Sequence, residues 1–354
     1  MPTRPLPTSD RKAWIDIAKA LGIWLVVWAH LPQGNLAVKA FFYTFHMPLF
    51  FFLSGYLLKP QSLWLTLQLG VRRLLLPYLL YALLAWACWL ALAVWKQPAL
   101  LQSDSLVPGY VLKPLLGVVY AVGDYTDSSL MINMPVWFLV GLYVMAAIFA
   151  LLLSTLSPLR ALLACLCLAT LPYALAQQGT DLLWSIDSAL MALPFYALGH
   201  YLAGVSKSPQ ARALAGRIGQ GPGRAVWLCG ALLAGAVTAA IAAHNGRVDI
   251  NLLQYGASPF WFYAGGVSGI AMVLLLAVGL SALLRGDWLL TLSRGTIVIL
   301  GLHSIVLGGL LSAMRLLGLE RGTLQDGAAA LLLVLAFVPV IHWVERRAPV
   351  LMGR

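Results

Sequence analysis

Long runs of hydrophobic residues, separated by short polar connections, make up most of this chain. An α-helix needs about 20 mostly apolar residues to cross the roughly 30 Å hydrocarbon core of a bilayer. Runs close to that length predict ten transmembrane helices, near residues 14–31, 41–58, 74–95, 136–156, 160–176, 182–205, 225–243, 259–284, 288–313 and 327–345. The pattern therefore predicts an all-α, polytopic integral membrane protein in which residues 1–354 form a single transmembrane domain.

Composition agrees with this prediction and excludes a soluble domain. Of the residues, 61% are hydrophobic and only 10% are charged, whereas soluble domains carry about 25% charged residues. The net charge of +11 does not indicate nucleic-acid binding, because the basic residues are scattered between apolar runs and form no stripe. The four cysteines lie inside apolar runs, and no His, Cys or acidic cluster has metal-ligand spacing, so we expect no bound metal.

The distribution of lysine and arginine predicts the orientation. In the ten-helix arrangement, sixteen of them lie on one side of the membrane, six lie on the other, and Lys19 lies within a helix. Cytoplasmic loops are enriched in Lys and Arg. We therefore expect both termini in the cytoplasm, with residues 1–13 as a cytoplasmic tail and 206–224 as a cytoplasmic linker loop. In the longest outer connection, residues 96–135, the apolar stretch Leu115–Val122 is too short to span.

The first predicted helix carries three ionisable residues, Asp16, Lys19 and His30. Such residues are expensive within a bilayer and are therefore functional candidates. Lys19 and His30 are eleven positions apart, which places them on nearly the same helix face, about 16 Å apart along the axis. Asp16 lies one turn before Lys19, where the two can form a structural ion pair. The alternative is a pair of interfacial residues that extend toward the headgroups.

His30 ends the first helix on the outer side, and His46 begins the second helix on the same side. The topology alone therefore places both imidazoles at a similar depth. Few groups other than histidine accept and return a proton near neutral pH. A single histidine at a helix end is more often an interfacial residue, but two at matched depth beside a groove-facing lysine favour catalysis, with His30 as the stronger candidate.

Further polar positions have both a functional and a simpler interpretation. Ser54 and its neighbour Gly55 are small and allow a close approach of a helix or a ligand. Arg72 and Arg73, at the predicted cytoplasmic side, can bind phosphates or merely anchor the topology. Trp137, at the outer start of the fourth helix, can line a site or belong to the interfacial aromatic belt.

Asp187 and His303 lie within predicted helices, and His303 is near the middle of its helix. A carboxylate or imidazole at such a depth generally faces the interior of the helix bundle. We therefore treat both as candidate groups of an internal site, while the remaining histidines are interpreted as interfacial.

Several strings of this sequence together resemble the membrane acyltransferase type 3 family, most closely its fucose 4-O-acetylase-like branch. The resemblance covers almost the whole chain in order, and the histidine-bearing string of the second helix is its most specific part. The strings are Asp16-x-x-Lys19 with His30, Phe45-His46-Met47-Pro48-Leu49-Phe50-Phe51-Phe52-Leu53-Ser54-Gly55-Tyr56, Arg73-Leu-Leu-Leu-Pro77-Tyr78, Trp137-Phe138-Leu139, Leu193-Pro194-Phe195-Tyr196-Ala-Leu-Gly199, Tyr255-Gly256 with Gly269-Ile270, and Gly295-Thr296 with Leu302-His303.

The resemblance implies a multi-pass protein of the plasma membrane, the inner membrane in a bacterium, that moves acetyl from acetyl-CoA to sugars of a surface polysaccharide or glycolipid. It implies that His30 acts as the general base or accepts the acetyl group itself. His46 is then the second catalytic candidate. The donor acetyl-CoA is expected at Lys19, Arg72 and Arg73, and the acceptor near Trp137, Ser54, His303 and Asp187.

Three positions depart from the family pattern. Many members carry arginine where this chain has Lys19. An arginine pair common in the family has its first member at Gly70 here, so only Arg73, with its neighbour Arg72, remains of that pair. A glutamate that some members carry after the first histidine falls on Phe41. An acidic partner for His30 must therefore come from elsewhere or be absent, and Asp187 is the candidate for that role.

Two other functional classes remain open at this point. A ten-helix bundle with buried charge is also compatible with a transporter of a lipid-linked sugar or a small metabolite. Acetylation by the purified protein would distinguish an acetyltransferase from such a transporter. An inactive structural partner in a polysaccharide assembly complex is the other class, which the presence of both His30 and His46 argues against.

Overall fold

The computed structural model describes residues 13–31, 35–59, 61–121, 132–206, 223–284, 286–319 and 321–354. The predicted tail, residues 1–13, lies outside the described residues except for its last residue. Only the two ends of the predicted loop 206–224 are described.

The described chain is almost entirely helical, as predicted, and its one β-type pairing is an isolated bridge between Asp249 and Gln254. The α-helices are α1 (Ala13–Ala29), α2 (Leu36–Tyr56), α3 (Leu63–Gly70), α4 (Leu76–Lys96), α5 (Lys113–Tyr120), α6 (Trp137–Thr155), α7 (Pro158–Leu168), α8 (Leu171–Gln177), α9 (Ile186–Val205), α11 (Gly223–Asn245), α12 (Pro259–Leu280), α13 (Asp287–Arg294), α14 (Thr296–Leu316) and α15 (Thr323–Arg347). The π-helical segments are η1 (Val71–Leu75) and η3 (Leu106–Leu112), and the 3₁₀ segments are η2 (Pro98–Gln102), η4 (Met134–Val136), η5 (Leu183–Ser185) and η6 (Pro349–Met352).

Within the described residues, nine helical stretches are long and apolar enough to cross a membrane. The helix α1 adds 17 residues, which at a rise of 1.5 Å per residue is about 26 Å. Each of the ten predicted spans therefore has a helical counterpart. The all-α, polytopic membrane fold is confirmed.

Three predicted spans are more irregular than their hydrophobic pattern suggested. The third belongs to a continuous helical stretch, Leu63–Lys96, of 34 residues, in which η1 separates α3 from α4. Pro77 has no N–H to donate to the carbonyl of Arg73, four residues earlier. That missing bond accompanies the wider π turn immediately before it.

The other two irregular spans are broken rather than extended. The span predicted at 160–176 consists of α7 and α8, with Pro172 in the first turn of α8. The span predicted at 288–313 consists of α13 and α14, which meet at Gly295. A Cβ at Gly295 would lie 2.4 Å from the side chain of Ile341 in α15. A glycine at this break therefore allows α15 to approach closely.

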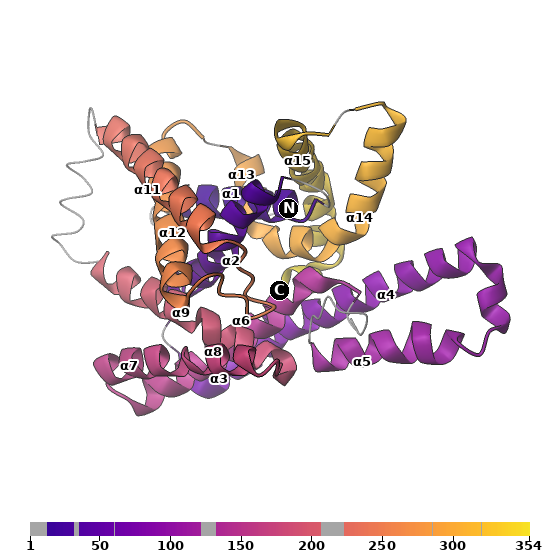
Figure 1. The fold of residues 1–354 in the computed structure, drawn as a ribbon, viewed down its shortest axis with the longest axis horizontal. Helices are drawn as coiled ribbons and strands as arrows, with labels where there is room; N and C mark the ends of the chain where they lie inside the picture. The colour runs from indigo at the N-terminus through magenta and orange to yellow at the C-terminus, as the bar shows by residue number, and fades with distance from the viewer. Residues whose placement is uncertain are drawn as a thin grey trace, which may run out of the picture.

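The apolar stretch predicted at Leu115–Val122 falls mostly in a helical segment of fifteen residues, Leu106–Tyr120, which runs back beside α4 (Figure 1), and its last residue lies outside the described residues. The hydroxyl of Tyr78 donates to the carbonyl of Val118 at 2.6 Å, and the indole of Trp86 donates to the carbonyl of Tyr110 at 2.9 Å. The segment is, as predicted, too short to span, and these bonds tie it to α4.

The helices α2 and α9 pack closely because each presents a glycine to the backbone of the other. A Cβ at Gly55 would lie 2.0 Å from the carbonyl oxygen of Tyr196, and one at Gly199 would lie 2.0 Å from that of Phe52. The predicted close approach at Ser54-Gly55 is thus a helix–helix contact. This contact fixes α2, which carries His46, against the core of the bundle.

Candidate functional site

A small internal cavity brings together residues from α1, α2, α6, α14 and the loop between α11 and α12. Its volume is about 20 Å³, enough to hold about one water molecule. His30, His46 and Trp137, predicted from the sequence as separate candidates, all line it. The remaining lining residues are Val26, Tyr43, Met47, Pro135, Asp249, Ile250, Asn251 and Leu300.

Each imidazole near this cavity is oriented by its own helix. Nδ1 of His30 lies 2.7 Å from the carbonyl oxygen of Val26, and Nδ1 of His46 lies 2.7 Å from that of Phe42. A carbonyl oxygen only accepts, so Nδ1 carries the proton in both rings. In the neutral imidazole, Nε2 then holds the lone pair, ready to accept a proton.

His303 lies against the same cluster. Its ring centre is 5.2 Å from that of His30, with the two planes nearly perpendicular, whereas the ring centres of His30 and His46 are 6.5 Å apart. Nδ1 of His303 donates to its own helix at Ile299 and Leu300, and its buried Nε2 has no hydrogen-bond partner in the described structure. His30 therefore lies between two other histidines.

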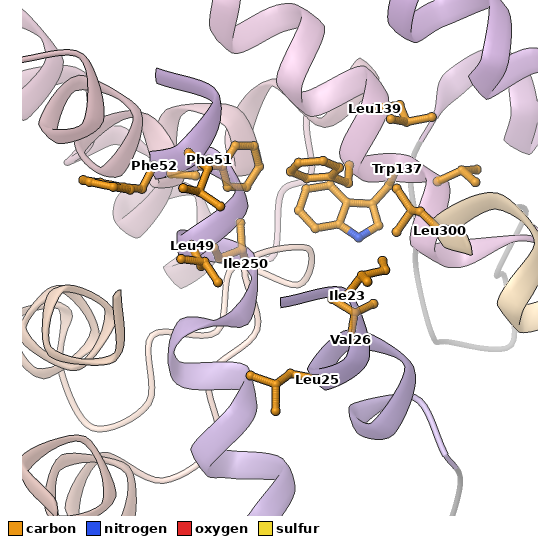
Figure 2. Packing of buried hydrophobic residues seen from close by; sticks show 14 of the residues in the cluster. Ile23, Leu25, Val26, Leu49, Phe51, Phe52, Trp137, Leu139, Ile250 and Leu300 are labelled. Atoms are coloured by element: carbon orange, nitrogen blue, oxygen red, sulfur yellow. The ribbon is translucent and has the colours of Figure 1, made fainter. Parts of the chain in front are cut away.

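An apolar cavity continues from the histidines along α1. It has a volume of about 30 Å³ and is lined by Ile23, Val26, Met47, Phe50, Phe138, Thr296, Ile297 and Leu300. Val26, Met47 and Leu300 line both cavities, so the two adjoin. Ile23 and Val26 lie between Lys19 and His30 on the face that the eleven-residue spacing predicted. Figure 2 shows Trp137 beside Leu300, with its indole facing Ile23 and Val26.

The sequence analysis did not identify Asp249, the carboxylate that lines the histidine cavity. It lies in the loop between α11 and α12, where it exchanges two backbone hydrogen bonds with Gln254, and its Oδ1 accepts from the N–H of Asn251 at 3.0 Å. The hydroxyl of Ser188 in α9 donates to the carbonyl of Ile250 at 3.0 Å. These bonds hold the short loop between α11 and α12 inside the bundle.

Burial raises the pKa of Asp249 from its ordinary value of 3.8 to about 6. The side chain is 7% exposed, and loss of water disfavours the charged form. The backbone N–H of Asn251 and the charge of Arg247 act in the opposite direction but more weakly. Asp249 consequently changes charge in a range where a carboxyl in water is already ionised.

Asp187 has a different position from the one expected for an acidic partner of His30. It is buried at the start of α9, where Oδ2 accepts from the N–H of Leu182 at 2.7 Å and Oδ1 from the N–H of Ser188 at 2.6 Å. It does not line the histidine cavity. These bonds satisfy free N–H groups near the start of a helix.

Asp16 and Ser54 lie away from the histidine cavity. Asp16 is buried and accepts a 2.6 Å hydrogen bond from the hydroxyl of Ser293 in α13. The hydroxyl of Ser54 donates to the carbonyl of Phe50 within its own helix. Lys19 is half-buried on α1. The predicted roles of Asp16 in an ion pair with Lys19 and of Ser54 at the substrate stay predictions.

Arg72 and Arg73 are exposed in the π turn, and the C-terminal segment lies against that turn. A Cβ at Gly353 would lie 2.4 Å from the carbonyl oxygen of Arg73. Gly353 has a φ of +71°, which favours glycine. The hydroxyl of Tyr81 in α4 also donates to the carbonyl of Leu351 at 3.0 Å. The segment around Leu351 and Gly353 therefore packs against the π turn, while the guanidinium of Arg354 is paired with Glu345.

Comparison with family models identifies the family to which this chain belongs. The model of the acyltransferase type 3 family, an acyltransferase domain, matches residues 12–344. The match covers nearly the whole chain, and the protein belongs to this family of membrane acyltransferases. No curated protein and no solved structure gives a significant match.

Proposed function

We propose that this protein is an O-acetyltransferase that takes acetyl from acetyl-CoA in the cytoplasm and transfers it to a hydroxyl of a surface polysaccharide or glycolipid. Within the family, we place the protein in the fucose 4-O-acetylase-like branch. The observation that carries it is the histidine cluster, in which His30 lies between His46 and His303 with Nε2 available as a base.

In the proposed step, Nε2 of His30 accepts the proton of the acceptor hydroxyl while the hydroxyl oxygen attacks the carbonyl carbon of the acetyl thioester. A C–O bond forms and the C–S bond breaks. The leaving thiolate takes up the proton, so that coenzyme A departs as a thiol. A positioned general base of this kind contributes about 10²- to 10⁴-fold to the rate. His46 lines the same cavity and is the second catalytic candidate.

Asp249 completes the proposed site. In its ionised form it supplies a negative charge in the cavity that stabilises the imidazolium formed when His30 accepts a proton. The groups that face it there are His30, His46 and Tyr43, and Arg247 is the neighbouring charge. Asp249 thus takes the part for which the sequence suggested Asp187.

The phosphates of acetyl-CoA are proposed to bind at Arg72 and Arg73. Lys19 is proposed to contact the donor at the start of the face of α1 that leads to His30. The acetyl end would then follow the face of α1 that carries Ile23 and Val26 toward His30. The two cavities along this path, of about 20 and 30 Å³, are too small to hold the acetyl-bearing end of acetyl-CoA. Binding therefore requires α1, α2, α6 and α14 to separate.

This route requires the basic ends of the helices to face the cytoplasm, as the bias of sixteen basic residues against six supports. A reporter inserted in the loop 206–224 should be cytoplasmic, and one inserted at 244–258 should be periplasmic or extracellular. Reporters on the same side would refute the orientation and with it the proposed route of the donor.

Purified protein in lipid vesicles, supplied with acetyl-labelled acetyl-CoA and extracted polysaccharide or glycolipid acceptor, tests the activity itself. We expect stoichiometric release of coenzyme A thiol and label in the acceptor. Mass spectrometry of glycans from a strain lacking the protein should show the loss of one acetyl group and identify the acceptor. Movement of a sugar or metabolite across the vesicle without thiol release would instead support a transporter.

A further inference from the structure

Three connections between helices meet near the histidine cavity, and each brings one basic residue. Lys39 lies in the first turn of α2, Arg247 lies in the loop between α11 and α12, and Arg321 lies between α14 and α15. The charges of both guanidiniums act on Lys39, as does the carboxylate of Asp326. We call Lys39, Arg247 and Arg321 together the basic rim.

Lys39 connects the basic rim to the histidines along one face of α2. Lys39, Tyr43 and His46 are spaced by four and then three residues, which places them on the same side of the helix. At a rise of 1.5 Å per residue, Lys39 and His46 are about 10 Å apart along the axis. Tyr43 lies between them and lines the histidine cavity, with its ring centre 4.9 Å from that of His46 and 6.4 Å from that of His30. Lys39 therefore lies one helical turn beyond the cavity.

Arg247 approaches the same cavity from the loop between α11 and α12. It precedes Asp249 by two residues, and its charge acts on that carboxylate, which lines the histidine cavity. The loop is held in place by the bridge between Asp249 and Gln254 and by the bond from Ser188 to Ile250. Arg247 is exposed and Asp249 is buried, so the loop passes from the surface to the cavity between these two residues.

Arg321 is fixed by Asp326 at the start of α15. Nε and Nη2 of Arg321 donate to the two carboxylate oxygens of Asp326 at 3.1 and 2.9 Å. Asp326 and Lys39 line one small cavity, which places this pair beside α2. The indole of Trp24 in α1 donates to the carbonyl of Gly327 at 3.0 Å and so holds the start of α15 there.

The basic rim carries more positive charge than its neighbouring carboxylates balance. Arg321 and Asp326 neutralise each other, and within the described residues neither Lys39 nor Arg247 forms an ion pair or a side-chain hydrogen bond. Asp249 is the remaining carboxylate that the described structure places near the rim, so positive charge exceeds negative charge by at least one. Like charges held together cost free energy, and a bound oxyanion reverses that cost.

Membrane topology does not account for this gathering. The three residues are half of the six basic residues on the side that is predicted to lie outside, where lysine and arginine are scarce. They come from three separate connections and yet act on one another. Lys96, another of the six, is by contrast exposed at the last residue of α4. A ligand of opposite charge explains the cluster, whereas a topology signal does not require one.

We propose that the basic rim is an anion-binding site for a carboxylate or phosphate group of the molecule that enters the histidine cavity. Lys39 and Arg247 bind the group, and Arg321 adds its charge from the pair with Asp326. Lysine acts on an oxyanion as a point charge, and arginine adds a planar pair of N–H donors. The inference rests on the proposed acetyltransferase function for the role of the entering molecule as acceptor, but not for the binding of the anion. In that function, the rim selects acceptors that carry an acidic group near the reacting hydroxyl.

Thermal unfolding tests the binding without any acyl transfer. Purified protein in non-ionic detergent is titrated with sodium phosphate or sodium D-glucuronate. D-glucose is the neutral match of glucuronate, and sodium chloride at equal ionic strength controls for general screening. A ligand that binds only the folded state raises the unfolding midpoint as its concentration rises. Phosphate and glucuronate should therefore raise the midpoint above that in sodium chloride, and glucose should not.

Lys39→Gln and Arg247→Gln identify the binding residues. Neither side chain forms an ion pair within the described residues, so both variants should fold. Each should raise the Kd for both anions about tenfold, the value of one hydrogen bond to a charged group. Lys96→Gln makes the same change of charge outside the rim and should leave the Kd unchanged. In transfer assays, Lys39→Gln should raise KM for an acidic acceptor and leave KM for acetyl-CoA unchanged.

Equal midpoints in phosphate, glucuronate and sodium chloride would overturn the inference, as would anion binding that both rim variants retain. Stabilisation by added phosphatidylglycerol, but by neither soluble anion, would assign the rim to a lipid headgroup and reject it as a site for the acceptor. The acetyltransferase function stands in each case if transfer is observed. Conversely, anion binding through Lys39 and Arg247 in a protein without transfer would retain the site and reject the acetyltransferase.

Discussion

The histidine cavity and a much larger groove in the described part of the molecule differ in what their polar atoms do. The groove, of about 550 Å³, lies between α7, α8, α9 and α12. Three of its four lining hydroxyls are already bonded: Tyr201 donates to Pro158, Tyr263 to Met191 and Thr170 to Cys167. The histidine cavity is far smaller, but the Nδ1 bonds of His30 and His46 leave Nε2 of each ring as an acceptor.

The difference shows that cavity size and chemistry have separate origins in this bundle. The large groove lies where α7 and α8 are interrupted and where Pro194 interrupts the bonding of α9, so it reflects irregular helices. The histidine cavity lies where three helices turn imidazoles toward one another. In this protein, unused hydrogen-bonding capacity identifies the candidate site better than volume does.

The largest effect is expected for His30→Ala. The variant loses the central base of the cluster, and acetyl transfer should fall at least about 100-fold. Transfer to acceptor is measured with the purified, monodisperse variant in vesicles. Near-normal transfer would mean that the histidine cavity serves packing only. The available Nε2 atoms would then not distinguish a catalytic site from the large groove.

Arg73→Ala should have the next largest effect, and on the donor alone. A lost hydrogen bond to a phosphate is worth about 1.5–3 kcal/mol, so KM for acetyl-CoA should rise about 10- to 100-fold while KM for the acceptor stays unchanged. Lys59→Ala, at an exposed basic residue outside the proposed donor surface, is the control. Equal donor kinetics for wild type and Arg73→Ala would reduce Arg73 to a topology anchor.

Asp249→Asn tests the role of Asp249 through the pH dependence of stability. The folded state holds a proton on Asp249 up to about pH 6, because burial raises the pKa of this carboxyl, whereas the unfolded state releases it near pH 4. Wild-type stability relative to the variant should therefore fall as pH rises from about 4 to about 6 and stay constant above that, with a total of at most about 3 kcal/mol.

Activity should follow the opposite trend, because the ionised carboxylate assists His30. The ratio of wild-type to Asp249→Asn transfer rates should rise across pH 6 and reach about tenfold, the value of one charged hydrogen bond or contact. Oδ1 of asparagine can still accept from the N–H of Asn251, so the loop is retained. A ratio that does not change with pH would remove Asp249 from the proposed site.

The smallest effect is expected in the large groove. Tyr201→Phe removes one hydrogen bond, to the carbonyl of Pro158, and should lower stability by about 1 kcal/mol. Transfer should stay within about twofold of wild type, because this groove contributes no reacting group. A loss of transfer comparable to that of His30→Ala, in a folded sample, would show that the groove and not the histidine cavity is the site.

The sequence predicted the helices well because span length and hydrophobicity depend on local composition. It missed the π turn before Pro77 and the break at Gly295, since both depend on what a neighbouring segment packs against. The proximity of His30 and Trp137 could be predicted because both lie at helix ends on the predicted outer side. His46 was expected at the start of its helix but lies in the middle of α2, because that helix begins at Leu36, earlier than its hydrophobic pattern indicated. The position of Asp249 could not be predicted, because the loop that carries it shows no periodic pattern that indicates its fold into the bundle.

The most direct measurement of the central claim is acetyl transfer by His30→Gln. Glutamine keeps much of the size of the side chain and some hydrogen bonding, but it cannot accept a proton near neutral pH. If His30 supplies chemistry, a correctly inserted and monodisperse His30→Gln sample should be nearly as inactive as His30→Ala, at least about 100-fold below wild type. Transfer close to the wild-type rate would contradict the account and would direct the search for the base to His46 or His303.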